Sequence, residues 1–362
     1  MKQLIYISEI TFPSKSAYAV QVMKMCDAFS KKGYNVTLFV LNNLNKSLHN
    51  TYNCSSKFKI KSFGLTKNNF INRLKYCAKI YLNLRFKKSK KIFYSRSIIT
   101  GLFLSFFFDK IIIEIHHPFK SFTLFLFNFF KFFKFLNKVK FVFISENLKR
   151  LFKLKQNSIV LEDAVDYENF EKLKKKNKIK NTCVYAGSFS KGKGLETIIE
   201  ISKSLPNINF HIYGDFTNSI ITREELKKLS NIIYKGYVSY KQIPKILNLY
   251  EVYLMPYSKK VYVRAKNLEV GKYMSPLKLY EYLASSGVLF ASQMQAYNHI
   301  LNNKNSVIIK NNSLKEWKNK LEQFFLNSSK FNYLSKNAKK LVKEKTWQKR
   351  VDRIEDFINV SI

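Results

Sequence analysis

Acidic residues and cysteine are both scarce in this sequence. Its 362 residues include 24 Asp and Glu against 64 Lys and Arg, which gives a formal net charge of +40. The four cysteines lie far apart and form no CxxC pair, so the chain is no disulfide scaffold, and the spacing argues against a zinc site. This cysteine usage fits a reducing cytoplasm. Hydrophobic residues make up 46% of the chain, which excludes a disordered basic tail.

Long apolar runs are missing as well. The longest strongly apolar stretches, Ile98–Phe108 and Phe122–Phe130, fall short of the roughly 20 residues that a spanning helix needs. The opening residues MKQLIYIS lack the apolar stretch of a signal peptide. We therefore expect neither a membrane span nor an export signal.

The positive charge has two explanations, and the sequence does not decide between them. A surplus of this size favours a polyanionic partner, such as nucleic acid, anionic lipid or a phosphorylated substrate. Only eight of the basic residues are Arg, and a chain rich in Lys, Asn, Ile, Phe and Tyr is also typical of A/T-rich codon usage. No RNP, KH or zinc-finger pattern is present, so specific base recognition is not expected.

One segment, Ser121–Lys138, is unusually rich in phenylalanine. It reads SFTLFLFNFFKFFKFLNK, and helical spacing would place Asn128, Lys131, Lys134 and Lys138 on one narrow face. A helix of this kind can lie in a bilayer interface. It can equally cover a parallel sheet and expose a stripe of lysines. The pattern does not decide between the two.

The order of strands and helices predicts an α/β fold. Apolar runs such as Gln3–Ser8 and Val36–Leu41 alternate with helical patterns such as Ala17–Lys32, and the alternation restarts with a strand at Thr182–Tyr185 and a helix at Leu195–Ser204. Such alternation indicates doubly wound parallel sheets. We expect two Rossmann-like domains facing across a cleft: residues 1–166, a charged linker at 167–180, residues 181–340, and a C-terminal helix within 341–362 that packs back toward the N-terminal domain.

Ligands of open parallel sheets bind beyond the carboxyl ends of the strands, so the loops after strands are the places to search. The loop after Thr182–Tyr185 reads AGSFSKGKG and leads into a helix. Small residues allow close backbone approach, and helix N-terminal amides favour anions. Lys191 and Lys193 add positive charge, although the Walker A spacing is absent.

Two further segments carry polar residues at similar places. In SPLKLYEYLA, Ser275 can cap a helix with Pro276 at its first position, and Lys278 lies near the positive helix start, where a cation is unfavourable unless an anion binds. Glu281, further along, reads on its own as a solvated helix residue. His116 and His117 directly follow the apolar run Lys110–Ile115, and they either form a simple turn or have a functional role.

Taken in order, these motifs resemble glycosyltransferase family 4. GSFSKGKG and SPLKLYEYLA are similar to the family's donor-site signatures, and the resemblance extends over nearly the whole chain. It implies a GT-B fold and transfer from a nucleotide-diphosphate sugar with retention of configuration. It also implies hexosyl or N-acetylhexosaminyl transfer without a metal or other cofactor, in bacterial cell-surface polysaccharide biosynthesis.

The resemblance also implies roles for individual residues. Lys193 would hold the donor diphosphate, Glu281 would bond the ribose hydroxyls, and His116 would contact the transferred sugar. The implied donor-binding residues are Ser16, Ala17, Gly187, Ser188, Lys191, Ser275, Pro276, Leu277, Lys278 and Glu281.

Two positions depart from the family pattern. Ser188 stands where many members carry Arg, and Tyr273 stands where the first glutamate of an E-x7-E pair would fall. Arg264 or Lys278 could replace the missing positive charge at the donor, and Arg96 could add to it. Sugar contacts that the missing glutamate usually makes are in question.

The expected partners are a nucleotide-sugar donor, a glycan or lipid-linked acceptor and an anionic membrane surface. We expect a cytoplasmic protein, peripheral on the inner face of the membrane. Three alternatives remain: a sugar-nucleotide 2-epimerase of GT-B fold, a non-catalytic basic protein that docks on membrane or nucleic acid, and, given Ser188 and Tyr273, a degenerate transferase without activity.

Overall fold

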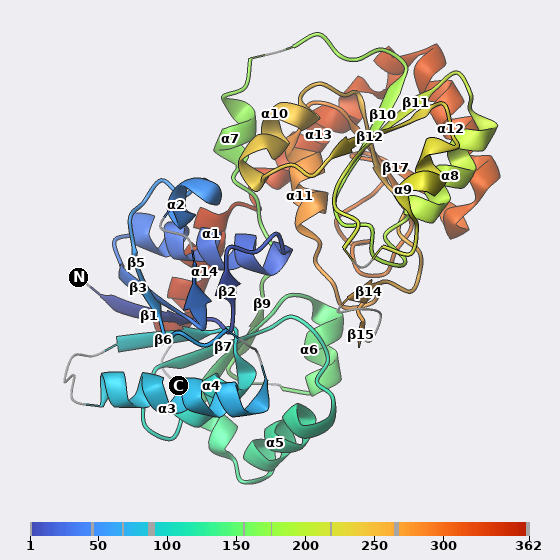
Figure 1. The fold of residues 1–362 in the computed structure, drawn as a ribbon. Coiled ribbons are helices and arrows are strands. Elements are labelled where there is room, and N and C mark those ends of the chain that lie inside the picture. The colour runs from blue at the N-terminus through green and yellow to red at the C-terminus, as the bar shows by residue number, and fades with distance from the viewer. Residues whose placement is uncertain are drawn as a thin grey trace. The chain divides into compact units, whose positions relative to one another are not determined.

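The computed structural model describes residues 2–44, 47–66, 69–85, 91–154, 156–174, 176–217, 219–263 and 268–359. The chain divides into two compact units (Figure 1). The N-terminal unit comprises Met1–Glu162 together with Trp347–Ile362, and the C-terminal unit comprises Asp163–Thr346.

A seven-stranded parallel sheet forms the centre of the N-terminal unit. Its order is β5-β3-β1-β6-β7-β8-β9, so the first strand lies inside the sheet and the chain order reverses between β1 and β6. The strands are β1 (Gln3–Ile7), β3 (Asn35–Val40), β5 (Lys59–Ser62), β6 (Lys91–Ser95), β7 (Ile111–Ile115), β8 (Val139–Phe143) and β9 (Ser158–Val160). Two short strands, β2 (Thr11–Phe12) and β4 (Asn42–Asn43), pair separately. A topological switch point of this kind is where open α/β sheets bind ligands.

Helices cover both faces of this sheet (Figure 1). They are α1 (Ala17–Lys31), α2 (Leu48–Thr51), α3 (Phe70–Leu84), α4 (Ile98–Leu104), α5 (Ser121–Phe132), η1 (Phe135–Lys138), α6 (Glu146–Phe152) and α14 (Trp347–Asn359). Ser16 caps α1 by accepting the Ala19 amide, and Gly33 adopts a φ of 91° directly beyond its end. The cap and the glycine thus set the two ends of α1.

The last helix, α14, is part of the N-terminal unit although it comes from the other end of the chain. Its Glu355 bonds Lys2 Nζ at 2.9 Å and the Tyr34 hydroxyl at 2.8 Å, and its Asp352 bonds Lys32 Nζ at 2.7 Å. Val351 and Ile354 are fully buried. The helix therefore belongs to the core of this unit.

The C-terminal unit repeats the same topology with six parallel strands in the order β12-β11-β10-β13-β16-β17, and its switch point lies between β10 and β13. The strands are β10 (Thr182–Ala186), β11 (Asn209–Tyr213), β12 (Ile232–Gly236), β13 (Val252–Met255), β16 (Val288–Ser292) and β17 (Val307–Ile309). A separate antiparallel pair is formed by β14 (Tyr262–Val263) and β15 (Leu268–Glu269).

Two apolar layers sandwich the second sheet. One includes side chains of α8 and α12, with Trp317 fully buried, and the other includes side chains of α7, α11 and α13. The helical segments are α7 (Tyr167–Glu171), α8 (Leu195–Ser204), α9 (Arg223–Lys227), η2 (Tyr240–Gln242), α10 (Ile243–Leu247), α11 (Leu277–Ala284), α12 (Leu314–Leu326), η3 (Lys310–Asn312), η4 (Ser328–Phe331) and α13 (Asn332–Val342).

The predicted α/β fold with two Rossmann-like units is confirmed, and two local expectations differ from the structure. The segment expected as a linker, 167–180, begins with α7, because Tyr167 and Phe170 are buried in the second unit. The helix expected over Ser121–Lys138 ends at Phe132. Lys134 takes a left-handed φ of 58°, which turns Phe135 back so that its ring meets Phe106 and Phe130.

Candidate functional site

A glycine turn follows β10 at the switch point of the C-terminal sheet. The Gly187 amide donates to Tyr213 O at 2.9 Å, and the Tyr185 hydroxyl donates to Ser188 O at 2.7 Å. A Cβ on Gly187 would collide with Nζ of Lys278. Only glycine therefore lets the backbone of this turn approach the lysine so closely.

Lys193 reaches back to this turn from its far end. Its Nζ donates to Ser188 Oγ at 2.7 Å, and burial lowers the pKa of the amine to about 8. Gly194, with a φ of 94°, then caps α8. Lys191 differs, since it is exposed and its Nζ lies 5.7 Å from the centre of the Tyr262 ring. The structure thus brings one of the two predicted lysines of this loop onto the glycine turn.

Lys278 is the most unusual side chain of the site. It is the second residue of α11 and only 8% exposed, and its Nζ has no hydrogen-bond partner among the described residues. The amine lies 3.5 Å from the centre of the Tyr185 ring and 5.4 Å from that of Tyr257. Burial, reinforced by the charge of Lys193, holds its pKa well below the ordinary value. A buried amine that has no polar partner and lies next to a second amine forms a favourable binding site for an anion.

Glu281 lies one turn beyond Lys278 on α11 and is half-buried, not a fully solvated helix residue. Burial raises the pKa of its carboxyl to about 7; Lys278 opposes this shift, and Asp166 adds to it. Its carboxylate can accept hydrogen bonds from hydroxyl groups, or donate one when protonated.

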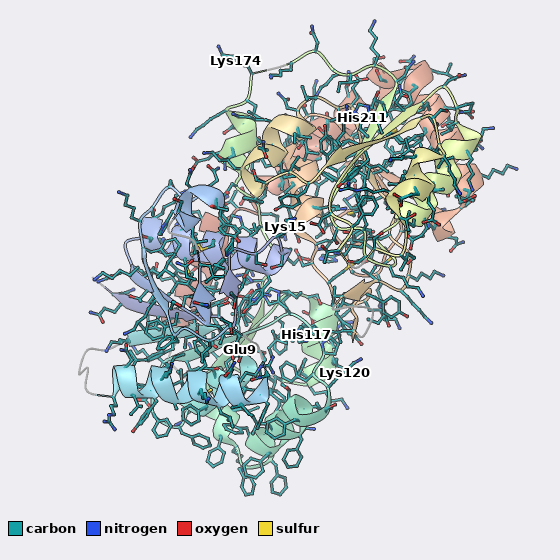
Figure 2. All side chains as sticks on the ribbon, in the orientation of Figure 1. Glu9, Lys15, His117, Lys120, Lys174 and His211 are labelled. Carbon is teal, nitrogen blue, oxygen red and sulfur yellow. The ribbon has the colours of Figure 1, made fainter. Side chains whose placement is uncertain are left out.

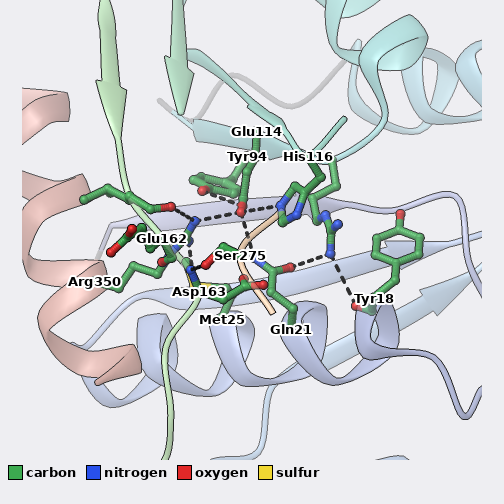
Figure 3. Close-up of polar contacts among 12 residues, drawn as sticks. Tyr18, Gln21, Met25, Tyr94, Glu114, His116, Glu162, Asp163, Ser275 and Arg350 are labelled. Atoms are coloured by element: carbon green, nitrogen blue, oxygen red, sulfur yellow. Dashed lines mark hydrogen bonds and ion pairs between the residues drawn. The ribbon is translucent and has the colours of Figure 1, made fainter. Parts of the chain in front are cut away.

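The start of α11 differs from its predicted form. Pro276, not Ser275, occupies the N-cap position, and Leu277 is the first helical residue. Ser275 Oγ instead accepts the Asp163 amide at 2.9 Å (Figure 3). The same oxygen lies 3.1 Å from the Tyr280 hydroxyl. These two bonds hold the segment before the helix in place. Tyr273 is half-buried, and Arg264 lies outside the described residues.

A second polar cluster lies in the N-terminal unit, at the carboxyl end of β7 (Figure 3). Glu114, fully buried, accepts bonds on Oε1 from Arg350 at 2.7 Å and from Gln21 at 2.8 Å, and on Oε2 from the Tyr94 hydroxyl at 2.7 Å. Burial alone would raise the pKa of Glu114, but Arg350 and His116 hold it well below its usual range.

His116 is joined to this carboxylate, with Nε2 2.6 Å from Glu114 Oε1. Burial, together with the charge of Arg96, lowers the pKa of the imidazole to about 3, against the pull of Glu114. The ring is therefore neutral at pH 7, and since Glu114 is ionised, Nε2 carries the proton and Nδ1 is a hydrogen-bond acceptor.

Arg96 follows β6 at the switch point of the first sheet. Its guanidinium donates to Gln21 Oε1 at 2.8 Å and lies 4.1 Å from the centre of the Tyr18 ring. Ser16 and Ala17 are exposed at the start of α1. The predicted residues of the N-terminal unit thus gather at the carboxyl ends of β6 and β7 and on α1.

The sequence did not point to Arg350, Tyr185 or Tyr257 as site residues. One signal was available for the first, because Arg is rare here and a planar fork suits several acceptors at once. Arg350 donates to Glu162 O at 2.8 Å, to Leu161 O at 3.1 Å and to Glu114. Nothing local marks the two tyrosines, whose side chains reach Lys278 only through the fold.

Two features are absent from the described residues. No group of three or more His, Cys, Asp or Glu side chains there could hold a metal ion. In the same ranges, no helix has the length and apolar character needed to cross a membrane.

Two Rossmann-type units, each built on a parallel sheet with a switch point, are the architecture of the GT-B fold. Residues 166–341 match the model of the family described as "Glycosyl transferases group 1". A glycosyltransferase from Rickettsia africae ESF-5 aligns with a TM-score of 0.75 and 12% identity over 99% of both chains. Alr3699/HepE from Anabaena, in complex with UDP and glucose, aligns with a TM-score of 0.72 and 11% identity over both whole chains.

One curated relative matches in sequence. TuaH of Bacillus subtilis (strain 168), a protein named as a glycosyltransferase of teichuronic acid biosynthesis, is 29% identical over 102 residues. The match covers 28% of this chain and spans about a quarter (24%) of TuaH.

Proposed function

We propose that the protein transfers a sugar from a nucleotide-diphosphate sugar to a glycan or lipid-linked acceptor in bacterial cell-surface polysaccharide biosynthesis. The observation that carries the proposal is the pair Lys193 and Lys278. Lys278 is buried and Lys193 is half-buried at the switch point of the C-terminal sheet, and both amines have lowered pKa values. A diphosphate supplies the negative charge that two such amines lack.

The lysines also fit the chemistry of transfer. When the sugar leaves, negative charge develops on the β-phosphate, and fixed cations and backbone amides at that point stabilise it without rearranging. Lys193, Lys278 and the amides of Gly187 and Ser188 would serve this purpose, with no metal required by the proposal. Ser275, Pro276 and Leu277 would shape the same pocket, and Lys191 would add charge at its margin.

Glu281 is proposed to bond the ribose hydroxyls of the donor. Its raised pKa of about 7 shows a half-buried carboxyl that lacks strong donors, and a vicinal diol supplies them. No glutamate stands at Tyr273, so sugar contacts usually made there would come from other groups.

The N-terminal unit is proposed to bind the acceptor and to bring His116 to the transferred sugar, with Ser16, Ala17 and Arg96 nearby in that unit. A neutral imidazole with Nδ1 as acceptor can take a hydrogen bond from a sugar hydroxyl. Transfer is proposed to proceed with retention of configuration and to move a hexose or an N-acetylhexosamine. The place of action is proposed to be the cytoplasm.

The test is turnover of a nucleotide-sugar panel with isolated bacterial glycolipid or glycan acceptors, comparing wild type with Lys193→Ala. Removing one such cation is expected to lower kcat by about 10²–10³-fold. Lys203→Ala is the matched control, because Lys203 is an exposed lysine of α8 that only pairs with Glu200.

Unchanged turnover in Lys193→Ala would contradict the assignment of this lysine. Conversion of the sugar nucleotide without any acceptor would instead support the 2-epimerase alternative. Nuclear magnetic resonance of the product's anomeric proton checks the proposed retention.

A further inference from the structure

We propose that the N-terminal unit docks on an anionic lipid bilayer through an aromatic face on α5 and its neighbours. This face consists of six exposed phenylalanines: Phe106, Phe122, Phe125, Phe129, Phe132 and Phe133. Figure 2 shows a fringe of aromatic rings projecting beside α5, near the labelled Lys120. The proposal is independent of the transferase reaction.

The core of the unit does not account for these rings. Within α5 only Phe127 and Phe130 are buried, whereas Phe125 is 66% and Phe132 81% exposed. An apolar face that merely covered the sheet would point its rings inward. The sequence left a core helix and an interfacial helix open, and the exposed rings favour the interfacial one.

Ring contacts link several of these phenylalanines to neighbouring elements. Phe106, beyond the end of α4, lies 4.9 Å from the buried Phe130 between ring centres, and Phe129 lies 4.7 Å from Phe133. At the other end of α5, Phe122 lies 5.2 Å from Phe70 of α3. Contiguous apolar patches of this kind mark interaction sites.

The charge around the face selects lipid over a second copy of the chain. Between the buried Glu114 and Glu146 the sequence has five lysines and no acidic residue. Of these, Lys120, Lys131 and Lys134 are exposed. Two copies joined through this face would oppose their lysines, whereas anionic headgroups would pair with them while the rings enter the interface. With twelve residues, α5 is only about 18 Å long and suits lying in the surface, not crossing it.

The experiment measures binding of the full chain to vesicles of phosphatidylcholine with 30% phosphatidylglycerol, without any sugar nucleotide. Wild type is expected to co-sediment with these vesicles and much less with pure phosphatidylcholine. Phe125→Ser/Phe132→Ser should lower the partition coefficient at least tenfold, because two largely exposed rings no longer enter the lipid. Lys120→Glu/Lys134→Glu should weaken binding at least threefold on the anionic vesicles alone.

Matched controls come from the C-terminal unit. Leu326→Ser removes an apolar side chain that is 86% exposed, and Lys336→Glu/Lys340→Glu changes the same charge on α13; both should bind as wild type does. In addition, Phe125→Trp should be quenched by brominated lipid, since both native tryptophans, Trp317 and Trp347, are buried.

Several results would overturn the proposal. The proposal fails if wild type does not bind the anionic vesicles. It also fails if Leu326→Ser loses as much vesicle binding as Phe125→Ser/Phe132→Ser, or if brominated lipid does not quench the fluorescence of Phe125→Trp. A stable dimer in sedimentation analysis that becomes monomeric in Phe125→Ser/Phe132→Ser would assign the face to a second copy instead. Since no turnover is measured, failure here leaves the proposed reaction untouched.

Discussion

Replacing Lys278 by Met should stabilise the protein without ligand and abolish its response to nucleotide. Met has a similar length, so packing against Tyr185 and Tyr257 is kept while the amine is removed. In wild type this amine is buried, and it has no hydrogen-bond partner among the described residues.

The size of the effect follows from two opposing contributions. A buried polar group without a partner costs about 1–3 kcal/mol, and the contact with the Tyr185 ring returns about 0.5–2 kcal/mol, with the upper figure for a desolvated cation. Lys278→Met should therefore raise the free energy of unfolding by up to about 2.5 kcal/mol. For a unit the size of Asp163–Thr346, this corresponds to an increase in Tm of up to about 10 °C.

A bound nucleoside diphosphate should make the wild type more stable than Lys278→Met. A nucleoside diphosphate at 100 times its Kd stabilises the wild type by about 2.7 kcal/mol, which exceeds the gain from the substitution. Because Lys278→Met lacks the cation, it should gain little. Differential scanning calorimetry with and without nucleoside diphosphate measures both effects.

The control is Lys178→Met in the same unit. Lys178 is a half-buried lysine, and unlike Lys278 it has hydrogen-bond partners: its Nζ donates to Asn248 O at 2.9 Å, to Tyr250 O at 3.2 Å and to Ser286 Oγ. Its removal leaves these acceptors unpaired and should lower Tm. The reasoning is refuted if Lys278→Met is less stable than wild type without ligand, or if the two melting temperatures do not change order when nucleotide is added.

Three further predictions concern the two clusters. The pKa of Lys193 is about 8 in the free protein, and a bound anion would raise it. Nucleotide binding should therefore take up protons at pH 8.5, and the affinity should fall as the pH rises above 8. Calorimetry in buffers of different ionisation enthalpy measures the proton uptake, and no uptake would contradict the assignment of Lys193. Arg350→Met leaves the buried Glu114 without its guanidinium and should lower the free energy of unfolding by about 3–5 kcal/mol in urea titrations, whereas a loss below 1 kcal/mol would show that the pair contributes little. Gly187→Ala should lower Tm, because it forces Lys278 aside and because the φ of Gly187, 157°, strains any residue with a Cβ. Gly187→Ala/Lys278→Ala should recover only the part of the loss that comes from the collision; a double variant as unstable as the sum of the two single variants would argue against the collision.

The sequence predicts the repeated strand–helix order well, because buried parallel strands are short apolar runs with clear boundaries. The helix at Leu195–Ser204 has the bounds that the pattern gives, and the strand expected over Thr182–Tyr185 extends one residue further, to Ala186. It misses β5 and β9: the first reads KIKS and the second is three residues long, so neither stands out as an apolar run.

The predicted site residues are easier to find than their surroundings. Lys193 and Lys278 lie in loops after strands or at a helix start, where local sequence reports on function. That Lys278 is buried against Tyr185, and that Arg350 joins Glu114 from 236 positions away, depends on long-range packing that no local pattern encodes.

The central claim is that Lys193 and Lys278 hold the diphosphate of a sugar nucleotide. Isothermal titration calorimetry with UDP, GDP, ADP and dTDP and their sugar derivatives tests it most directly. The account predicts that one nucleotide class binds wild type with Kd below 1 mM, roughly 4 kcal/mol of binding free energy or more, and that Lys193→Ala and Lys278→Met each weaken it at least about tenfold. Binding of none of them, or equal affinity in wild type and both variants, would contradict the claim.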